Sequence, residues 1–496
     1  MPAKATSRYL SPGNVYAEAD RLLAQGHRLA LVAAHDDGDS LRIVYLFEKG
    51  DPDRRIELTT SVNKSRPKIH SLAQLSFPAS RFEREMQDLF GIVPLEHPQP
   101  RRLVLHQHWP QGWFPMRKEV GTPTRMVPDA GSYPFVPVEG TGVYEIPVGP
   151  VHAGLIEPGH FRFWVIGETI MRMKARLWFV HKGIEKLFEG KTIQQGMTIA
   201  ERVSGDSAVG HGLAYCLCIE DALGIEVDEQ SGMIRSMLLE LERLYNHVGD
   251  IGALCNEVGY GIALARALTL RESLLRLNHS IAGHRLLRGG VVPGGVRLAR
   301  FPTIGELGAV ELALEELVEL VFAQSTVRER FTGTAVLTED AARELGVVGL
   351  VARASSLPCD ARVSNPFAKL PGCFDSVRGN GGDVMARLQV RVEEARISLK
   401  MVFESTGIQL ASSQTEVERY QNTKESASGT GIVEAWRGAA VHRVEIARGG
   451  ILTRLKIVDP SFFNWPALPV SLSETIVPDF PLANKSFNLS YAGNDL

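Results

Sequence analysis

Apolar residues at helical spacing come first along the chain. Residues 14–26 place Val15 and Leu22 on one side and end at Gly26, which predicts a helix. The next segments, RLALVAA, RIVYLFE and RIELTTSV, are rich in Val, Ile and Leu and are separated by Asp and Gly turn residues. They predict strands of a small sheet.

A second short helix is predicted over residues 80–91. Ser80 and Glu83 have the spacing of a capping box, in which the hydroxyl and the carboxylate satisfy free backbone N–H groups. Gly91 is placed to end this helix. Beyond it, residues 93–137 are rich in Pro, Arg, His and Trp, which indicates an extended segment that faces a partner.

From about Gly149 the pattern becomes mainly helical. Three stretches repeat apolar residues with a period near 3.6 and predict long amphipathic helices of a bundle: 233–254, 306–324 and 383–404. Residues 431–458 instead contain alternating runs around Gly449-Gly450, which predicts a β-hairpin.

The composition excludes several classes of protein. The 496 residues are 44% hydrophobic and 22% charged with a formal net charge of −3, so the chain is globular and neither basic enough to suggest nucleic acid nor disordered. Five scattered cysteines do not form a disulfide framework and fit a reducing compartment. We see no secretory signal and no apolar run long enough to span a membrane, so the chain is expected to be cytoplasmic.

Self-contained catalytic motifs are missing from the sequence. The glycines of residues 289–296 lack the spacing and the Lys-Ser/Thr of a phosphate loop, and no GxSxG elbow is present. Cys216 and Cys218 lie in an apolar run and are better explained as core residues than as metal ligands. His247 and Asp250 share a helix face, which favours a helix–helix contact over catalysis.

Eight ordered segments resemble the large subunit of energy-converting, membrane-bound nickel–iron hydrogenases of the formate hydrogenlyase and hydrogenase-4 type. They are residues 149–170, 181–192, 200–211, 241–253, 283–296, 382–391, 433–442 and 462–468. Residues 82–109 are similar to the C subunit of NADH:quinone oxidoreductase (complex I), whose D subunit is homologous to the hydrogenase large subunit. The resemblance implies a fused C/D arrangement with an α+β fold: a small N-terminal α/β domain (1–125), a linker (126–145) and a mainly α-helical domain (146–496).

The metal-binding positions of that family differ here. Hydrogenases hold their nickel–iron pair with four cysteine thiolates, the soft ligands that such metals need. The corresponding positions in this chain are Ser204, Ser207, Ser490 and Gly493. Hydroxyls are hard, neutral donors and glycine has no side chain, so we expect no nickel–iron centre and no metal. The chain ends at Leu496, without the tail that is often removed from hydrogenases after nickel insertion, which agrees with this expectation.

Other family positions are retained. Arg437 matches the arginine that overhangs the metal pair, with Trp436 in place of the usual proline; it would hold an anion, or form an ion pair with Glu434 or an aspartate. His152 resembles the histidine that faces the quinone head group in the D subunit, but the quinone-binding tyrosine corresponds to Gly205. Arg437 and His152 are therefore the candidate catalytic residues. The candidate cavity-lining residues for a cofactor are His152, His211 and Arg437.

Four further residues of the matched motifs would form a proton or hydrogen-bond network, or only stabilise the bundle. They are His160, His181, Glu185 and Arg202.

The resemblance implies a peripheral subunit of a membrane-bound oxidoreductase complex, attached to the inner face of the cell membrane through its partners. The expected partners are a complex I B-subunit-like iron–sulfur small subunit, a ferredoxin-like subunit and antiporter-like membrane subunits. The cavity is expected to hold a quinone or to act as a conformational relay, with the iron–sulfur cluster and nicotinamide binding in other subunits. Whether the chain itself is catalytic stays open, although hydrogen activation is not expected.

Two alternatives remain at this stage. The chain could be a non-catalytic scaffold or assembly subunit that binds partners through residues 95–118, including Arg101, Arg102 and Trp109. It could also be a hydrogenase large subunit with unusual oxygen ligands, which the preference of nickel for soft ligands argues against.

Overall fold

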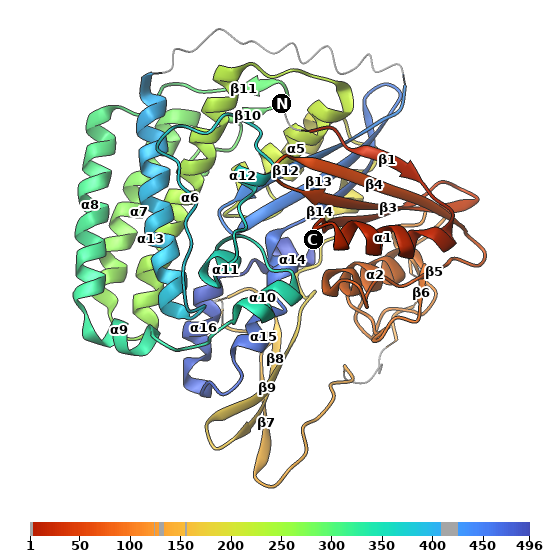
Figure 1. Cartoon of the computed structure of the whole chain (residues 1–496), viewed down its shortest axis with the longest axis horizontal. Coiled ribbons are helices and arrows are strands. Elements are labelled where there is room, and N and C mark those ends of the chain that lie inside the picture. The colour runs from red at the N-terminus through yellow and green to blue at the C-terminus, as the bar shows by residue number, and fades with distance from the viewer. Residues whose placement is uncertain (1–2, 124, 128–132, 154–155, 408–424) are drawn as a thin grey trace.

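The computed structural model describes residues 3–123, 125–127, 133–153, 156–407 and 425–496. An N-terminal sheet and a bundle of long helices lie on opposite sides of a second, C-terminal sheet (Figure 1). A narrow three-stranded arm extends away from all three parts (Figure 1). The α+β fold class expected from the sequence is confirmed.

The N-terminal sheet has the order β1-β4-β3-β2, with β1 parallel to β4 and the other pairs antiparallel. Its strands are β1 (Thr6–Tyr9), β2 (Arg28–Asp36), β3 (Ser40–Lys49) and β4 (Arg54–Asn63). Helix α1 (Val15–Ala24) confirms the first predicted helix and buries Val15 and Leu22. A short parallel pair follows, made of β5 (Lys68–His70) and β6 (Val93–Leu95).

The second helix, α2 (Phe77–Phe90), begins earlier than predicted, and its capping box is wrong. Glu83 lies inside the helix and accepts hydrogen bonds from Ser71 Oγ and the Leu72 N–H, both at 2.5 Å. Its carboxylate therefore stabilises the preceding loop rather than the helix start. Gly91 ends the helix with a φ of 75°, as predicted.

The arm is an antiparallel meander that the sequence analysis missed. It consists of β7 (Val143–Val148), β8 (His160–Ile166) and β9 (Thr169–Arg176). β7 begins inside the linker predicted over 126–145, of which residues 128–132 lie outside the described residues. The expectation of mainly helical structure from Gly149 is thus wrong for this stretch. In the first half of β8, buried Phe161 and Phe163 alternate with half-buried residues, as in a strand.

The helical bundle confirms the three long amphipathic helices. Its main members are α5 (Ala208–Leu223), α6 (Glu229–Glu257), α7 (Gly261–Ala282), α8 (Ile304–Ala323) and α13 (Val384–Glu404). Shorter elements connect and cover them: α3 (Ile184–Leu187), α4 (Ile193–Ala200), β10 (Val291–Val292), β11 (Gly295–Val296), α9 (Ser325–Phe331), α10 (Glu339–Leu345), α11 (Gly349–Ala354) and α12 (Ala361–Ser364).

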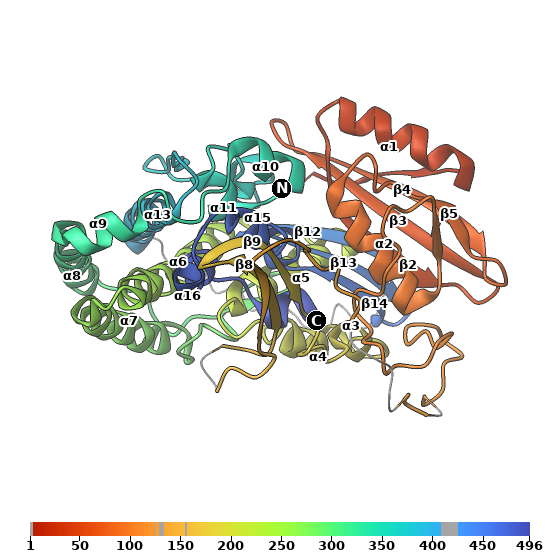
Figure 2. The ribbon, with the colours of Figure 1, turned by 90° about the horizontal axis from the view of Figure 1, so that it is seen from below.

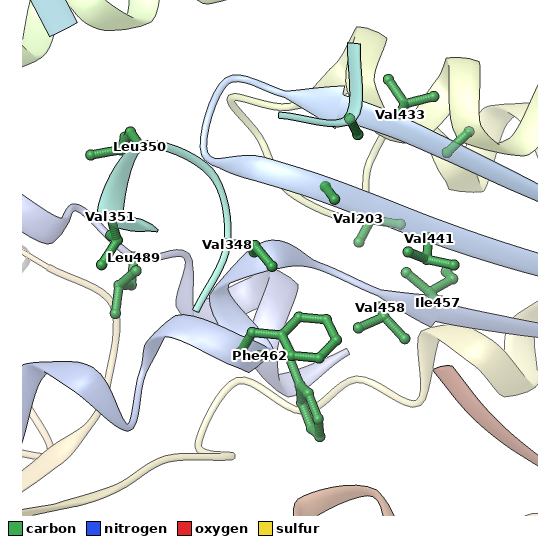
Figure 3. Close-up of a cluster of buried hydrophobic side chains, with 14 of the residues drawn as sticks. Val203, Val348, Leu350, Val351, Val433, Val441, Ile457, Val458, Phe462 and Leu489 are labelled. Atoms are coloured by element: carbon green, nitrogen blue, oxygen red, sulfur yellow. The ribbon is translucent and has the colours of Figure 1, made fainter. Parts of the chain in front are cut away.

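The C-terminal sheet contains the predicted hairpin and one strand more. β12 (Ala427–Ala435), β13 (Gly438–Ala447) and β14 (Ile451–Val458) form a meander, and Gly449-Gly450 lies in the turn between the last two strands. The chain then ends in α14 (Pro460–Asn464), α15 (Ala467–Ser471), α16 (Phe480–Phe487) and α17 (Tyr491–Asp495). β13 and β14 contribute Val441, Ile457 and Val458 to the apolar core in Figure 3.

Buried ion pairs join the N-terminal part to the C-terminal sheet, which lie side by side in both views (Figures 1 and 2). Arg443 Nε donates to Glu57 Oε1 at 2.8 Å. Lys456 Nζ lies 2.6 Å from Glu85 Oε1 and 3.0 Å from Glu185 Oε1. These pairs link strands and helices that are distant in sequence. We call this interface the seam; its buried charges are neutralised only when the two parts pack together.

Within the described part of the chain, no helix combines the length and the apolar character needed to cross a membrane.

We expect Lys456→Met to lower the free energy of unfolding by about 3–5 kcal/mol, because two buried carboxylates lose their shared ammonium partner. Thermal and denaturant unfolding would measure the loss. Arg276→Met is the control, since the Arg276–Glu272 pair is exposed and should contribute less than about 1 kcal/mol. Equal stability of both variants would contradict a structural role for this seam.

Candidate functional site

The four positions that correspond to metal ligands in the resembling family meet around the start of α5 and the start of α17. Ser204 Oγ and Ser490 Oγ are 2.9 Å apart although 286 residues separate them in sequence. Ser490 caps α17 by accepting the Gly493 N–H at 2.9 Å, and Ser207 is the N-cap residue of α5. The serine side chains are buried, with exposed fractions of 2–5%. The motifs around residues 204–207 and 490–493, which are far apart in sequence, therefore lie together in the fold, as the resemblance implied.

The space beside the Gly493 α-carbon is filled by the carboxylate of Asp459. A Cβ added at Gly493 would lie 2.4 Å from both Cγ and Oδ2 of Asp459, far closer than atoms in contact. Asp459 is fixed twice: Oδ1 accepts the Ser461 N–H at 2.7 Å and caps α14, and Oδ2 lies 2.9 Å from His211 Nε2. This arrangement leaves room for no side chain at position 493.

His211 continues the contact into the C-terminal sheet. Its Nδ1 lies 3.0 Å from His442 Nε2, and both rings are fully buried. The simplest tautomers have His211 Nε2–H donating to Asp459 and His442 Nε2–H donating to His211 Nδ1. Burial lowers the pKa of His442 well below its ordinary value, which keeps this ring neutral. Burial opposes ionisation of Asp459, but the His211 hydrogen bond lowers the pKa of its carboxyl overall.

Arg437 forms a bidentate pair with Asp206 beside the serines. Nη1 and Nη2 lie 2.7 and 2.6 Å from the two carboxylate oxygens, and Ser204 Oγ donates to the same carboxylate at 2.9 Å. Arg437 Nε donates to the Asn488 carbonyl at 2.5 Å. Burial would raise the pKa of Asp206, but Arg437 lowers it. The aspartate alternative for Arg437 is confirmed.

Glu434, the other partner considered for Arg437, lies in a separate ionic cluster. It accepts from Arg353 Nη1 at 2.7 Å, and Arg353 Nε also donates to Glu394 at 2.6 Å. His247 on α6 reaches the same Glu394 at 2.8 Å. Asp250, one turn further on, accepts from Arg391 at 2.9 Å, so the helix–helix contact predicted for the His247 and Asp250 face is confirmed.

His152 does not contact this cluster directly. Its Nε2 lies 2.7 Å from the Gly159 carbonyl, and its ring lies 5.8 Å from that of Phe161. Phe161 lies 6.3 Å from Trp465, whose indole N–H donates to the Ser490 carbonyl at 3.2 Å. The candidate residues His211 and Arg437 therefore share one cluster, while His152 is linked to it only through aromatic rings.

The remaining expected network residues are dispersed. His160 Nδ1 lies 3.2 Å from the Gly149 carbonyl, and His181 Nδ1 lies 2.7 Å from the Asp495 carbonyl. Glu185 belongs to the seam with Lys456, and Arg202 donates to the Thr198 carbonyl at 2.6 Å on the surface. These four form local structural contacts rather than one network.

Cys216 and Cys218 are core residues, as the sequence favoured. Both are fully buried, and burial raises the pKa of each thiol well above its ordinary value. Their Sγ atoms lie near Met197 Sδ (3.7 Å) and the Tyr215 carbonyl (3.1 Å). Neither thiol is positioned to replace a missing metal ligand.

The side chains at the four positions do not fit a nickel–iron pair. They supply three hard hydroxyl donors and no fourth ligand, whereas such metals need thiolates. Ser204 and Ser490 already bind each other, and Asp459 occupies the remaining place. Within the described ranges, no group of three or more His, Cys, Asp or Glu side chains is arranged to hold a metal ion. Figure 3 shows Val203 and Leu489, neighbours of the serines in sequence, in an apolar core.

Sequence reasoning missed Asp206, His442, Asn488 and Asp459 as members of the cluster. Asp206 and His442 stand inside motifs that identified the resemblance, and the only signal for Asp459 was an Asp-Pro pair typical of a helix start. Three of these residues, Asp206, His442 and Asp459, contact Arg437 or His211 across more than 200 residues of sequence. Asn488 lies only 51 residues from Arg437.

Comparisons with known proteins show the family of the chain. Residues 12–125 match the family model described as respiratory-chain NADH dehydrogenase, 30 Kd subunit, and residues 257–426 match that of the 49 Kd subunit. Hydrogenase-4 component G of Escherichia coli (strain K12) is 33% identical over 427 residues, 83% of this chain and 73% of that protein. Formate hydrogenlyase subunit 5 of the same strain is 31% identical over 454 residues, 89% of this chain and 79% of that protein.

A solved structure shares the fold. The chain resembles part of the membrane-bound sulfane sulfur reductase, described as an archaeal respiratory membrane complex, with a TM-score of 0.65. The match has 24% sequence identity and covers 73% of this chain and all of that one.

We expect Gly493→Ala to lower the free energy of unfolding by about 1–3 kcal/mol, because the new Cβ must displace Asp459 and break its contact with His211. Gly205→Ala is a matched control in the same cluster, since a Cβ there has no atom within 4 Å and should change stability by less than about 0.5 kcal/mol. Thermal unfolding of both variants distinguishes them. Equal midpoints would show that Asp459 does not enclose position 493 as tightly as described.

Proposed function

The chain belongs to the family of hydrogenase-4 component G and formate hydrogenlyase subunit 5, and from this premise we propose that it is a subunit of a membrane-bound oxidoreductase complex. The chain matches the family models of both the 30 and the 49 Kd NADH dehydrogenase subunits. In this proposal the chain itself holds no nickel–iron centre. It would serve as a protein component of an electron-transfer assembly without activating hydrogen itself.

The observation that carries this proposal is the closed polar cluster. Its hydroxyls bind each other at 2.9 Å, and the Asp459 carboxylate lies where a fourth ligand would start. Converting the serines to ligands would require breaking the Ser204–Asp206 and Ser490–Gly493 hydrogen bonds, and the neutral oxygens gained would be poor donors to nickel.

In this proposal the cluster acts as a closed relay: a line of buried hydrogen bonds in which a change of protonation at one side chain alters the next. Asp459, His211 and His442 form an unbroken line of hydrogen bonds from α14 to β13. A proton added to His211 at Nδ1 would force His442 to switch tautomer, because the shared position between the rings holds one hydrogen. The relay thus couples the C-terminal sheet to α5 and α14, and it needs no bound cofactor.

The quinone expected from the resemblance stays a prediction. His152 would donate a hydrogen bond to the quinone. This histidine is partly exposed and lies in the loop between β7 and β8. Binding would require Nε2 to exchange the Gly159 carbonyl, now at 2.7 Å, for a quinone oxygen.

The partners are part of the same proposal. An iron–sulfur small subunit would deliver electrons, and a ferredoxin-like subunit and antiporter-like membrane subunits would complete the complex on the inner face of the membrane. The family consists of components of multi-subunit assemblies, which supports partners of this general kind.

In the scaffold alternative, Arg102 and Trp109 would contact a partner, but both side chains make contacts within their own loop. Arg102, expected at its interface, directs both guanidinium nitrogens to the carbonyls of His106, Trp109 and Pro110 at 2.9–3.2 Å. Trp109 stacks on Trp113 with centroids 4.9 Å apart. These side chains hold their own loop together, so their loss would disturb folding as much as assembly.

Metal analysis of the complex purified with its native partners tests the proposal. We expect no nickel, iron only in the amount that iron–sulfur partners account for, and no hydrogen-dependent dye reduction. Formate hydrogenlyase subunit 5, prepared in the same way within its own complex, is the positive control. Nickel near one atom per chain together with hydrogen activity would contradict the proposal and favour unusual oxygen ligands.

A further inference from the structure

Six cationic side chains lie near two aromatic rings at the arm. Four of the six are on β8 and β9, and the other two come from α2 and from the loop after β6. Tyr133 and Phe135 contact each other with centroids 4.8 Å apart. The guanidinium carbons of Arg162 and Arg176 lie 4.5 Å from the Phe135 ring and 4.9 Å from the Tyr133 ring. We call the cationic set the basic patch; its members are Arg84, Arg101, Arg162, Arg172, Lys174 and Arg176.

Strand register brings four of these charges to one face. Residues 172, 174 and 176 alternate along β9 and point to the same side of the sheet. Arg162 on β8 is directly opposite Lys174 on β9. Like charges in directly opposite positions destabilise a sheet, so folding alone does not account for this pair.

Counter-charges are scarce around the basic patch. Glu145 lies 3.3 Å from Arg162. Among the described residues, no carboxylate lies within ion-pair distance of the other five cations. The nearby Asp88 uses Oδ2 to accept the N–H groups of residues 103–105 at 2.8–3.2 Å. Partial desolvation by its neighbours, together with the charges of Arg172 and Arg101, lowers the pKa of Lys174.

Several of the cations are held in place. Arg101 Nη1 donates to the Pro134 carbonyl at 2.9 Å, and Arg84 Nε donates to the Arg101 carbonyl at 2.7 Å. Arg176 donates to the carbonyls of Leu103 and Leu105. Arg172 and Lys174 are exposed between these fixed groups. The fixed guanidinium groups of Arg84, Arg101 and Arg176 are planar forks, which fit discrete carboxylates better than the diffuse charge of a lipid surface.

We propose that the basic patch binds a carboxylate-rich segment of another polypeptide in the complex. The partner places aspartate or glutamate side chains between Arg172, Lys174 and Arg101, where they neutralise cations that have no ion-pair partner among the residues that the structure describes. This inference rests on the proposed function, because it requires the chain to act as a subunit. It adds which surface docks and what chemistry the partner presents.

Zero-length carbodiimide cross-linking of the complex purified from native membranes tests this directly. The reagent activates a carboxylate, and the Lys174 amine then forms an amide with it as the reagent leaves as a urea. Mass spectrometry should find Lys174 joined to an Asp or Glu of another subunit. Lys174→Arg should abolish this cross-link and leave assembly intact. Lys174 recovered without any link to another subunit would overturn the proposal.

Charge reversal provides the second measurement. Arg172→Glu combined with Lys174→Glu should weaken retention of the cross-linked partner at least tenfold in a salt titration of the complex. Arg266→Glu combined with Arg328→Glu makes the same charge change at two exposed sites of the bundle and should have no such effect. Unchanged retention in the first variant would contradict the proposal.

Two further outcomes are distinguishable. Binding of the isolated chain to phosphatidylglycerol vesicles through Arg172 and Lys174, with Lys174 unlinked in the complex, would mean that the patch faces lipid and would overturn the polypeptide partner. If the wild-type chain purified with no partner at all, the proposed function itself would be wrong.

Discussion

The Asp459 carboxylate is the group on which the candidate site depends. It caps α14, accepts a hydrogen bond from His211 and fills the space beside Gly493. A carboxylate in this position excludes any side chain at 493, so the segment that ends the chain packs against α14 through backbone and glycine rather than through a ligand. The serines at 204 and 490 then satisfy each other and need no metal to complete their hydrogen bonding.

Buried ion pairs occur at several places in the fold. The Asp206–Arg437 pair lies beside the serines, and Glu394 and Glu434 share Arg353 deeper in the bundle. Such pairs contribute little net stability when intact but cost several kcal/mol when one partner is removed. They therefore fix a single arrangement of helices and sheet around the cluster. This rigidity is compatible with a closed relay and less so with a pocket that must open to admit a ligand.

The spacing of apolar residues predicted the long helices, and the order of the family motifs predicted the position of the candidate site. The features that the sequence did not predict depend on contacts between residues that are distant in sequence. The long helices α6, α8 and α13 follow from the spacing of their apolar residues alone. The meeting of Ser204 with Ser490 followed from a family resemblance, because no local pattern connects them. Asp459 and His442 could not be identified, since their roles depend on His211, which reaches both across more than 200 residues. The Glu83 capping box failed for the same reason: a loop serine and a loop amide compete for its carboxylate.

The most direct test of a metal-free cluster is anomalous X-ray diffraction at the nickel and iron absorption edges, from crystals of the complex isolated from nickel-supplied cells. The account predicts no nickel or iron peak between the Ser204 and Ser490 hydroxyls, with Asp459 beside Gly493 and in contact with His211. A nickel peak there, with serine oxygens as ligands and Asp459 displaced, would contradict it.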